Sequence, residues 1–247
     1  EPQTDHYLPA EIRDLFEEAA SEGDTQHRIR WPTRDLAMCS FLAILGVRAA
    51  ELIAANVGWI TQERLDDLGP RLDGAWLFWV QGKRERVRSI PLSQELLEVH
   101  DRWQEERVAR FGPALPSDPL FVTNTEERFN YQRLKYWLRL LNREAGLRDR
   151  SLHTLRHTAG IQLANDGVSL NVIQALLGHV GVATAGIYTA LASAHLSDVV
   201  RETQANALVN QPVPFTAPST TLRSTVHRPR APPIVPLTTV ALYASST

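Results

Sequence analysis

Apolar side chains recur every three or four residues in several separate segments of this chain, and that spacing predicts amphipathic helices. The first segment runs from Leu8 to Ala20, with Leu8 on its apolar side and acidic residues on its other face. Residues 33–45 are apolar almost throughout, which predicts a buried helix capped by Thr33. Further helices are expected over Arg48–Ala55, with Glu51 in the turn after Arg48, and over Gln94–Arg110.

Two runs of a different kind lie between these helices. Residues Trp76–Val80 and Val87–Leu92 are rich in branched and aromatic side chains, and the polar segment QGKRER joins them. Such a pair predicts an antiparallel hairpin with Lys83 at or near its turn. The pattern therefore adds a small antiparallel sheet to a mainly helical chain.

The clearest amphipathic pattern lies in residues 130–145. Asn130 is expected to cap this helix, because its side-chain oxygen can accept a backbone N–H of the first turn. Apolar residues fall on one face of the helix and basic residues on the other. The inward residues are expected to be Leu134, Trp137, Leu138 and Leu141, and the outward ones Arg133, Lys135, Arg139 and Arg143.

Three more helices are predicted toward the C-terminus. They are Thr154–Ala164, ending at Asn165-Asp166-Gly167; Leu170–Leu177, capped by Ser169 and ending before Gly178; and Ala190–Leu208. Beyond them the sequence becomes rich in Pro, Thr, Ser and Ala, which is typical of a flexible segment. We expect one domain over residues 1–208 and a flexible tail over residues 209–247.

Other features of the sequence indicate where the protein works. No window approaches the roughly 18 unbroken apolar residues of a membrane span. The N-terminal residues EPQTDHYLPAEIRD are too polar and acidic for a signal peptide. We therefore expect a cytoplasmic protein with no membrane partner. The single cysteine, Cys39, lies in the apolar run LAMCSFLAIL and is expected to be buried and not a nucleophile.

Charge is distributed unevenly along the chain. The formal net charge of −2 does not by itself indicate a nucleic-acid binder. Residues 1–47 hold four Arg against nine Asp or Glu, whereas residues 128–156 hold seven Arg and Lys135 against two acidic residues. This local excess of positive charge indicates either a surface that follows a polyanion or an ordinary solvated helix face.

The segment SLHTLRHTAG, residues 151–160, brings three cationic or protonatable side chains onto one helical turn: His153, Arg156 and His157. Such groups repel one another unless a metal or an anion lies between them. The two histidines have the spacing of a zinc-binding helix, but Thr154 stands where the catalytic Glu of that motif belongs. An anion fits better, because the planar fork of Arg156 can hold two phosphate oxygens. We expect no metal and no cofactor.

Six residues in short motifs follow one another in a definite order along the chain. They are Arg48 in LGVRAAEL, Lys83 in QGKRER, His153 and Arg156 in HTLRHT, His179 in LLGH, and Tyr188 in GIYT. In order and local wording, this series resembles the catalytic domain of tyrosine recombinases, the phage integrase family. The resemblance covers roughly residues 7–205 and implies a mainly helical α+β catalytic domain with a small antiparallel sheet.

The resemblance implies a site-specific recombinase or integrase that cleaves and rejoins double-stranded DNA. Tyr188 is then the nucleophile, which forms a covalent 3′-phosphotyrosine. Its phenol has an ordinary pKa of about 10 and needs a base, for which His153 is the family's candidate. Lys83 is the matching general acid for the leaving 5′ oxygen.

The remaining groups would hold the phosphate. Arg48 and Arg156 are expected to clamp its oxygens, and His179 to donate one more hydrogen bond, because attack on a phosphodiester builds negative charge there. His157 is expected to brace its helix, and Glu51 to orient its neighbours. The basic helix with Arg133, Lys135, Arg139 and Arg143 is the expected DNA contact.

Alternatives accompany these assignments. Lys83 is otherwise an exposed hairpin residue, since about ten extra residues around TQERLDDLGPRLDG make its placement ambiguous. Tyr188 is otherwise an ordinary half-buried tyrosine, and His179 is otherwise only a helix-capping residue. Arg48 otherwise serves only to pair with Glu51. The alternative functions are a type IB topoisomerase-like enzyme that relaxes DNA and a DNA-binding accessory protein that does not cleave.

Family members also differ from this chain in what precedes the catalytic domain. They usually carry a helical domain that closes around the other face of the DNA, and we expect no such domain before Tyr7. The full-length protein is expected to form a homotetramer on DNA, and the isolated domain is expected to be a monomer. Its location is expected to be the cytoplasm, in association with the nucleoid.

Overall fold

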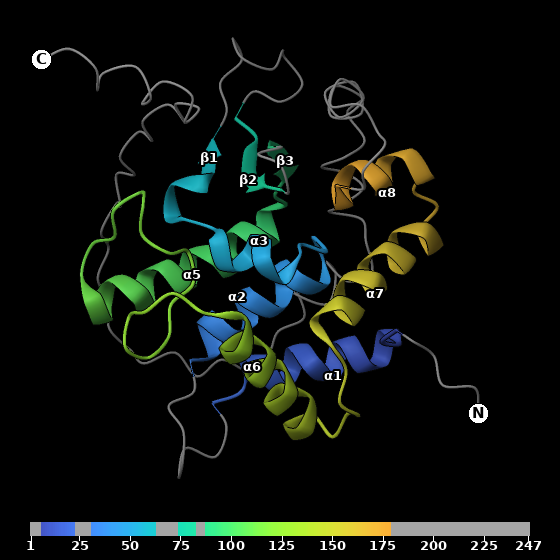
Figure 1. The fold of residues 1–247 in the computed structure, drawn as a ribbon, viewed down its shortest axis with the longest axis horizontal. Helices are drawn as coiled ribbons and strands as arrows, with labels where there is room; N and C mark the ends of the chain where they lie inside the picture. Colours follow the sequence, from blue (N-terminus) through green and yellow to red (C-terminus); the bar gives the residue numbers. More distant parts are fainter. Residues whose placement is uncertain (1–5, 23–30, 63–73, 83–86, 179–247) are drawn as a thin grey trace, which may run out of the picture. The chain divides into compact units, whose positions relative to one another are not determined.

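Helices make up most of the structure, with a small sheet at one side (Figure 1). The computed structural model describes residues 6–22, 31–62, 74–82 and 87–178. The helices are α1 (Pro9–Ala20), α2 (Pro32–Ala43), α3 (Ala49–Ala54), α5 (Gln94–Phe111), α6 (Tyr131–Glu144), α7 (Leu152–Asn165) and α8 (Leu170–Leu177). The strands are β1 (Ile60–Gln62), β2 (Trp76–Gln81) and β3 (Val87–Pro91), and a 3₁₀ turn, Val57–Trp59, precedes β1. The predicted fold class, mainly helical with a small antiparallel sheet, is confirmed.

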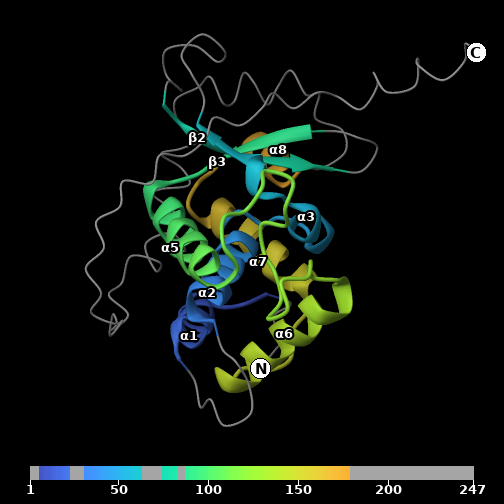
Figure 2. The same ribbon diagram turned by 90° about the vertical axis from the view of Figure 1, so that its left-hand side faces the viewer.

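Helix α2 lies at the centre of the hydrophobic core. Helices α1, α5 and α7 all pack against it, and Figure 2 shows it between them. Its middle residues Ala37, Met38, Phe41 and Leu42 are fully buried, as expected for a helix that is apolar on every face. Cys39 is also buried, and burial raises the pKa of its thiol, so this side chain is a core residue as predicted.

The start of α2 differs from the prediction. Pro32 lies in its first turn and Trp31 is its N-cap, so Thr33 does not cap this helix. Proline suits this position, because its ring fixes φ near the helical value and a helix leaves the first N–H groups unpaired anyway. The Thr33 hydroxyl instead donates to the Glu106 carboxylate, which ties the start of α2 to α5.

The sheet has the order β1–β2–β3, with antiparallel neighbours. β2 and β3 form the predicted hairpin, in which Phe78 lies opposite Ile90 and Val80 opposite Arg88. Residues that face each other across strands, or that alternate along one strand, share a face of the sheet. Arg88 therefore lies on the face whose Phe78, Val80 and Ile90 belong to the hydrophobic core. β1 was not predicted, since three residues are too few for an alternating pattern to register.

Tyr7 joins the beginning of α1 to two other helices. Its backbone N–H donates to Thr158 Oγ1 of α7 at 2.9 Å, and its hydroxyl donates to Asn142 Oδ1 of α6 at 2.9 Å. Leu8 was predicted to lie on the apolar face of the first helix, and this is wrong. Leu8 is the N-cap of α1 and 47% exposed, because the chain has not yet entered the helix there.

Helix α6 has the two faces that its sequence predicted. The Asn130 side chain accepts the backbone N–H of Arg133 at 2.9 Å, which is the expected cap. Its apolar residues are buried against the core. The buried set includes Leu134, Trp137, Leu138 and Leu141, and the exposed set includes Arg133, Lys135, Arg139 and Arg143.

Helices α7 and α8 form the last described part of the chain. α7 begins at Leu152, two residues before the predicted start, because the Ser151 side chain accepts the Thr154 N–H at 3.2 Å and caps the helix. α8 follows Ser169, its N-cap by position, although this serine makes no side-chain cap hydrogen bond. Gly178 ends α8 in the left-handed conformation, with φ 65°.

Several predictions lie outside the described residues. They concern Lys83, His179, Tyr188, the helix Ala190–Leu208 and the division of the chain at residue 208. These remain predictions. Among the helices that the structure describes, none is both long and apolar enough to cross a membrane.

Candidate active site

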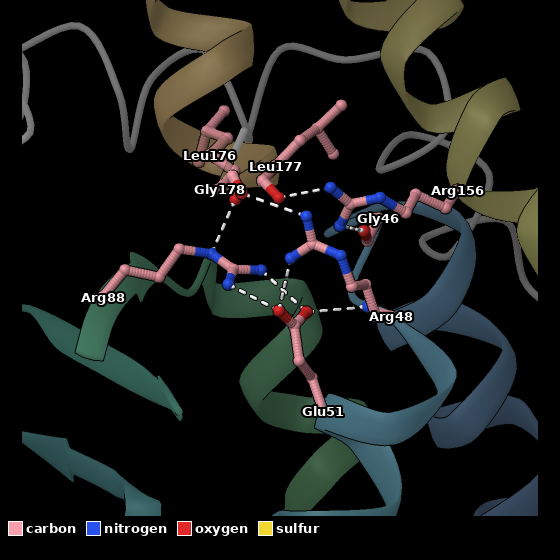
Figure 3. Close-up of polar contacts among 8 residues, drawn as sticks. All are labelled: Gly46, Arg48, Glu51, Arg88, Arg156, Leu176, Leu177 and Gly178. Carbon is pink, nitrogen blue, oxygen red and sulfur yellow. Dashed lines mark hydrogen bonds and ion pairs between the residues drawn. The ribbon is translucent and has the colours of Figure 1, made fainter. Parts of the chain in front are cut away.

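Three arginines and one glutamate converge where the ends of α2, α3 and α8 meet β3 and α7 (Figure 3). Arg48 precedes α3, Glu51 lies in its first turn, Arg88 extends from β3 and Arg156 from α7. The first and last of these residues, Arg48 and Arg156, are more than 100 positions apart in the sequence. We call these four residues the arginine cluster.

Glu51 is the centre of the cluster. Its Oε1 accepts hydrogen bonds from Arg48 Nη1 at 2.7 Å and from Arg88 Nη1 at 2.8 Å. Its Oε2 accepts from the Arg48 backbone N–H at 2.8 Å and from Arg88 Nη2 at 2.9 Å. Burial alone would raise the pKa of Glu51, but the hydrogen bonds and charge of Arg88, together with those of Arg48, lower the pKa below its usual range. The carboxylate is therefore ionised at neutral pH and bridges two guanidinium groups.

The C-terminal end of α8 accepts a hydrogen bond from each arginine. Arg88 Nε donates to the Leu176 carbonyl at 3.0 Å, and Arg48 Nη2 donates to the Gly178 carbonyl at 3.0 Å. Arg156 Nη2 donates to the Leu177 carbonyl between them. The last carbonyls of a helix lack partners within it and carry partial negative charge. Three guanidinium groups thus bind three consecutive carbonyls and fix the point from which the chain continues.

Two glycines allow these elements to approach so closely. Gly178 has positive φ, and a Cβ atom there would lie 2.9 Å from Arg88 Nη1. Gly46, which accepts from Arg156 Nη1 at 2.7 Å through its carbonyl, also has positive φ. A Cβ atom at Gly46 would lie 2.6 Å from Leu177 Cδ2. Both positions therefore require glycine for its conformation and for its lack of a side chain.

The cluster carries two net positive charges, since three arginines face one glutamate. Arg156 is only 5% exposed. Its burial, with the nearby charges of Arg48 and Arg88, lowers its pKa to about 10, although Glu51 opposes the shift. Arg156 therefore stays protonated at neutral pH. The Arg48 side chain is 41% exposed. An anion in solvent can therefore reach the cluster at Arg48.

The structure places the predicted site residues in three groups. Arg48, Glu51 and Arg156 lie together in the cluster. His153 and His157 are exposed on α7, whereas Arg156, three residues after His153, is buried. Of the three side chains that SLHTLRHTAG brings together in the sequence, Arg156 is the one that belongs to the arginine cluster. Lys83, His179 and Tyr188 lie outside the described residues.

Arg88 is a cluster residue that the sequence did not single out. The available signal was its place in the run VRSIPL, where it alternates with Ile90 on the face of β3 that packs on the core. A charged residue at an apolar position of a strand needs a buried partner. The sequence does not name that partner, because Glu51 lies 37 residues earlier in another element.

Replacing Glu51 with Gln is expected to lower the free energy of unfolding by about 3 kcal/mol at pH 7, because it leaves buried arginines without their counter-charge. Urea denaturation of this chain measures the loss. The pKa of Glu51 is lowered in the folded state, so its stabilisation is fully present above pH 4.5, its ordinary value, and is lost as pH falls through the folded pKa. The difference in the free energy of unfolding between the wild type and Glu51→Gln should therefore decrease in acid.

Glu11 provides a matched control for this prediction. It also lies in the first turn of a helix, accepts the Leu8 backbone N–H at 2.7 Å and pairs with Arg150 at 2.8 Å. It binds one arginine, and its side chain is 22% exposed. Glu11→Gln is expected to cost about 1 kcal/mol. Equal losses for the two variants would contradict the special role of Glu51.

Comparison with known proteins identifies the family. The chain belongs to the phage integrase family, whose model matches residues 9–195. Tyrosine recombinase XerD of Pseudomonas putida is 32% identical over 189 residues, and tyrosine recombinase XerC of Roseiflexus castenholzii is 31% identical over 197 residues. The predicted membership in the tyrosine recombinase family is thereby confirmed.

The matches also show how much of a relative this chain represents. They cover 72% and 77% of this chain but only 59% of XerD and 58% of XerC, so the chain spans less than two thirds of these relatives. The crystal structure of XerA recombinase superposes with a TM-score of 0.55 at 26% identity, covering 76% of this chain and 59% of XerA. That of XerH site-specific recombinase bound to difH substrate has a TM-score of 0.57 at 23% identity, which establishes the shared fold.

Proposed function

We propose that this chain is the catalytic part of a site-specific DNA recombinase that cleaves and rejoins double-stranded DNA through a covalent 3′-phosphotyrosyl intermediate. The observation that carries the proposal is the arginine cluster, which holds two net positive charges at the end of α8. Tyr188 lies ten positions after Gly178, the C-cap of that helix. The names of the relatives XerC and XerD, both tyrosine recombinases, support the same reaction.

The charge of the cluster suits the chemistry of a phosphodiester. The substrate phosphate carries one negative charge, and attack on phosphorus adds a second to its nonbridging oxygens. Two net positive charges match that state better than the ground state, which is the condition for catalysis. Arg48 and Arg156 are the proposed clamp, and His179, the residue after Gly178, is the proposed further donor.

The bond changes balance without a nucleotide cofactor. The Tyr188 oxygen forms a bond to phosphorus, and the bond from phosphorus to the 5′ oxygen breaks. The phenol proton passes to His153, and Lys83 gives a proton to the leaving 5′ oxygen. Rejoining reverses these steps, with the 5′ hydroxyl as the attacking group. In the complete protein, a homotetramer on DNA is the proposed assembly for exchanging strands.

Covalent capture tests this proposal. The chain is incubated with a pool of duplexes whose flanking arms have random sequence. Each duplex carries a nick near the cleavage position, so that the cleaved strand loses a short fragment and cannot be rejoined. We expect a protein–DNA adduct that survives SDS and EDTA, and peptide mapping is expected to locate the nucleotide on Tyr188. An adduct on another residue, or no adduct under conditions where the chain binds duplex DNA, would refute the mechanism. The second outcome would favour a non-cleaving accessory protein.

A topoisomerase is distinguished by a separate measurement. An enzyme of that kind relaxes a supercoiled plasmid without needing a particular sequence. We expect no relaxation of a plasmid that lacks the sequence enriched by covalent capture. If plasmids with and without this sequence were relaxed at equal rates, the topoisomerase alternative would replace the recombinase proposal.

Helix α6 is the proposed DNA-contact surface. Its outer face carries four exposed basic residues and the half-exposed rings of Tyr131 and Tyr136, and Arg139 lies 5.8 Å from the ring centre of Tyr136. Basic side chains beside exposed aromatic rings are suited to a polyanion with stacked bases. Arg133 and Arg143 pair with carboxylates at 2.5 Å and 3.8 Å, whereas Lys135 and Arg139 have no carboxylate partner among the described residues.

Lys135→Gln and Arg139→Gln are therefore expected to weaken DNA binding chiefly at low salt. Each lost phosphate contact should reduce the slope of log affinity against log salt by about 0.9. Fluorescence anisotropy with a duplex of arbitrary sequence measures the slope between 50 and 200 mM NaCl. Arg102→Gln, an exposed residue on α5, is the control and should leave the slope unchanged. Unchanged slopes in both α6 variants would show that DNA contacts another surface of the protein.

A further inference from the structure

The guanidinium of Arg88 is held on two sides. Both of its terminal nitrogens donate to Glu51, and its Nε donates to the Leu176 carbonyl of α8. The side chain is 6% exposed. The edge of the fork that could grip two phosphate oxygens is thus occupied by a carboxylate. Arg88 is placed to act on other residues of the cluster and not on the phosphate.

The partners of Arg88 are also the supports of Arg48. The half-exposed guanidinium of Arg48 has two hydrogen-bond acceptors, Glu51 Oε1 and the Gly178 carbonyl. Arg88 binds the same Oε1 at 2.8 Å. It also lies over Gly178, where a Cβ atom would be 3.0 Å from its Cζ, and it binds the carbonyl two residues earlier. Each support of Arg48 therefore depends on a contact with Arg88.

We propose that Arg88 is a positioning residue for the cleavage reaction: it holds Glu51 and the end of α8 so that Arg48 faces the phosphate. This inference rests on the proposed function, and it concerns a residue with no role in the reaction assigned so far. Strand β3 provides the fixed base, since Arg88 pairs with Val80 in the hairpin and shares its face with Ile90 in the core. In the sequence, Lys83 lies between β2 and β3, and His179 directly follows Gly178.

Charge and geometry at this position are separable by substitution. Arg88→Gln would remove one positive charge from the cluster as well as its fork. Arg88→Lys keeps the charge, but an ammonium on a flexible stem cannot bind both oxygens of Glu51 and the Leu176 carbonyl in one fixed plane. Arg88→Lys therefore tests positioning with the net charge unchanged.

Arg150 provides the matched control. Its side chain is also 6% exposed, and it pairs at 2.8 Å with Glu11 in the first turn of α1, as Arg88 pairs with Glu51 in the first turn of α3. It lies outside the arginine cluster. Arg150→Lys thus makes the same chemical change at the same degree of burial, with a similar expected loss of stability.

The first measurement is the single-turnover cleavage rate of the captured nicked duplex at saturating protein. Arg88→Lys is expected to lower this rate by about 10- to 100-fold, because misplacing a catalytic group by about 1 Å can cost about 100-fold in rate, and to leave DNA affinity within about twofold. Arg150→Lys is expected to leave both unchanged. If Arg88→Lys cleaves at the wild-type rate, or loses rate and affinity in equal proportion, the positioning role is wrong.

A double-mutant cycle tests the route of the effect. If Arg88 acts through Glu51, adding Arg88→Lys to Glu51→Gln should lower the rate by less than about threefold, because the shared interaction is already lost. Effects that multiply in full would show that Arg88 acts independently of Glu51 and would overturn the route proposed here.

A second measurement needs no DNA and keeps the inference testable if the wild type proves unable to cleave. The order parameter of the Arg48 side-chain Nε–H is measured by ¹⁵N relaxation. The order parameter is expected to be equal in the wild type and in Arg150→Lys, and clearly lower in Arg88→Lys. Equal order parameters in all three proteins would show that Arg88 does not hold Arg48 in place. Failure of cleavage by the wild type, with this difference intact, would instead refute the proposed function.

Discussion

Replacing Tyr188 with Phe is expected to abolish the covalent protein–DNA adduct while DNA affinity stays within about twofold. The substitution removes one oxygen, the atom proposed to bond to phosphorus, and no charged group of the cluster. Removing a covalent nucleophile typically lowers the reaction rate by about 10⁴-fold or more. Gel electrophoresis in SDS with a labelled nicked duplex measures the adduct.

Tyr188 is close enough to α8 in the sequence to reach a phosphate bound at the arginine cluster. It follows Gly178 by ten residues, so the backbone can place it at most about 35 Å from the end of α8. That end is bound by all three arginines of the cluster. A nucleophile on the segment after α8 is therefore tethered to the proposed phosphate site.

A second tyrosine controls for loss of a hydroxyl in general. Tyr243, in the Pro/Thr/Ser-rich segment after residue 208, has no assigned role, and Tyr243→Phe should form the adduct at the wild-type rate. An adduct that persists in Tyr188→Phe would locate the nucleophile elsewhere. Loss of the adduct in both variants would indicate a defect in DNA binding and not in chemistry.

Arg156→Lys is expected to lower the cleavage rate by about 100- to 1000-fold, the range found when one stabilising donor is removed from a transition state. The two terminal nitrogens of Arg156 reach carbonyls in different segments, Gly46 after α2 and Leu177 in α8. This pair of bonds fixes the plane of the guanidinium. A lysine keeps one positive charge but has no fork, so it can neither hold both carbonyls in that geometry nor present two aligned N–H groups to a phosphate.

Arg34 is the matched control for Arg156. Each is 5% exposed, and Arg34 also donates to a backbone carbonyl, that of Val122, at 3.2 Å. It lies in the first turn of α2, whereas the cluster gathers beyond the other end of that helix. Arg34→Lys should lower thermal stability to a similar extent without lowering the cleavage rate of the folded fraction. Equal rate losses in both variants would mean that the Arg156 effect is structural.

The arginine cluster also explains why Glu51 matters in a site that we propose binds an anion. Without a carboxylate, three guanidinium groups would repel one another in a buried place, and the pKa of Arg156 is lowered first by its burial and then by that repulsion. Glu51 and the carbonyls of α8 reduce the repulsion but leave two net positive charges. The folded domain therefore retains the charge that a phosphate can use.

Much of the fold followed from short-range patterns in the sequence. The two faces of α6, its Asn130 cap and the β2–β3 hairpin were all predicted, because periodicity and capping involve residues within a few positions of one another. The same locality explains the errors. Thr33 resembled a cap, yet Pro32 already suited the first turn, and β1 was too short for its alternation to be visible.

The sequence alone determined the family, the order of its motifs and most of the helices, because each is written in contiguous or regularly spaced residues. Tertiary structure decided which charged side chains meet. It turned His153 and His157 outward on α7, buried Arg156 and brought Arg88 from β3 onto Glu51. Ion pairs between distant segments depend on how helices and strands pack, and the spacing of residues along a chain carries no record of that packing.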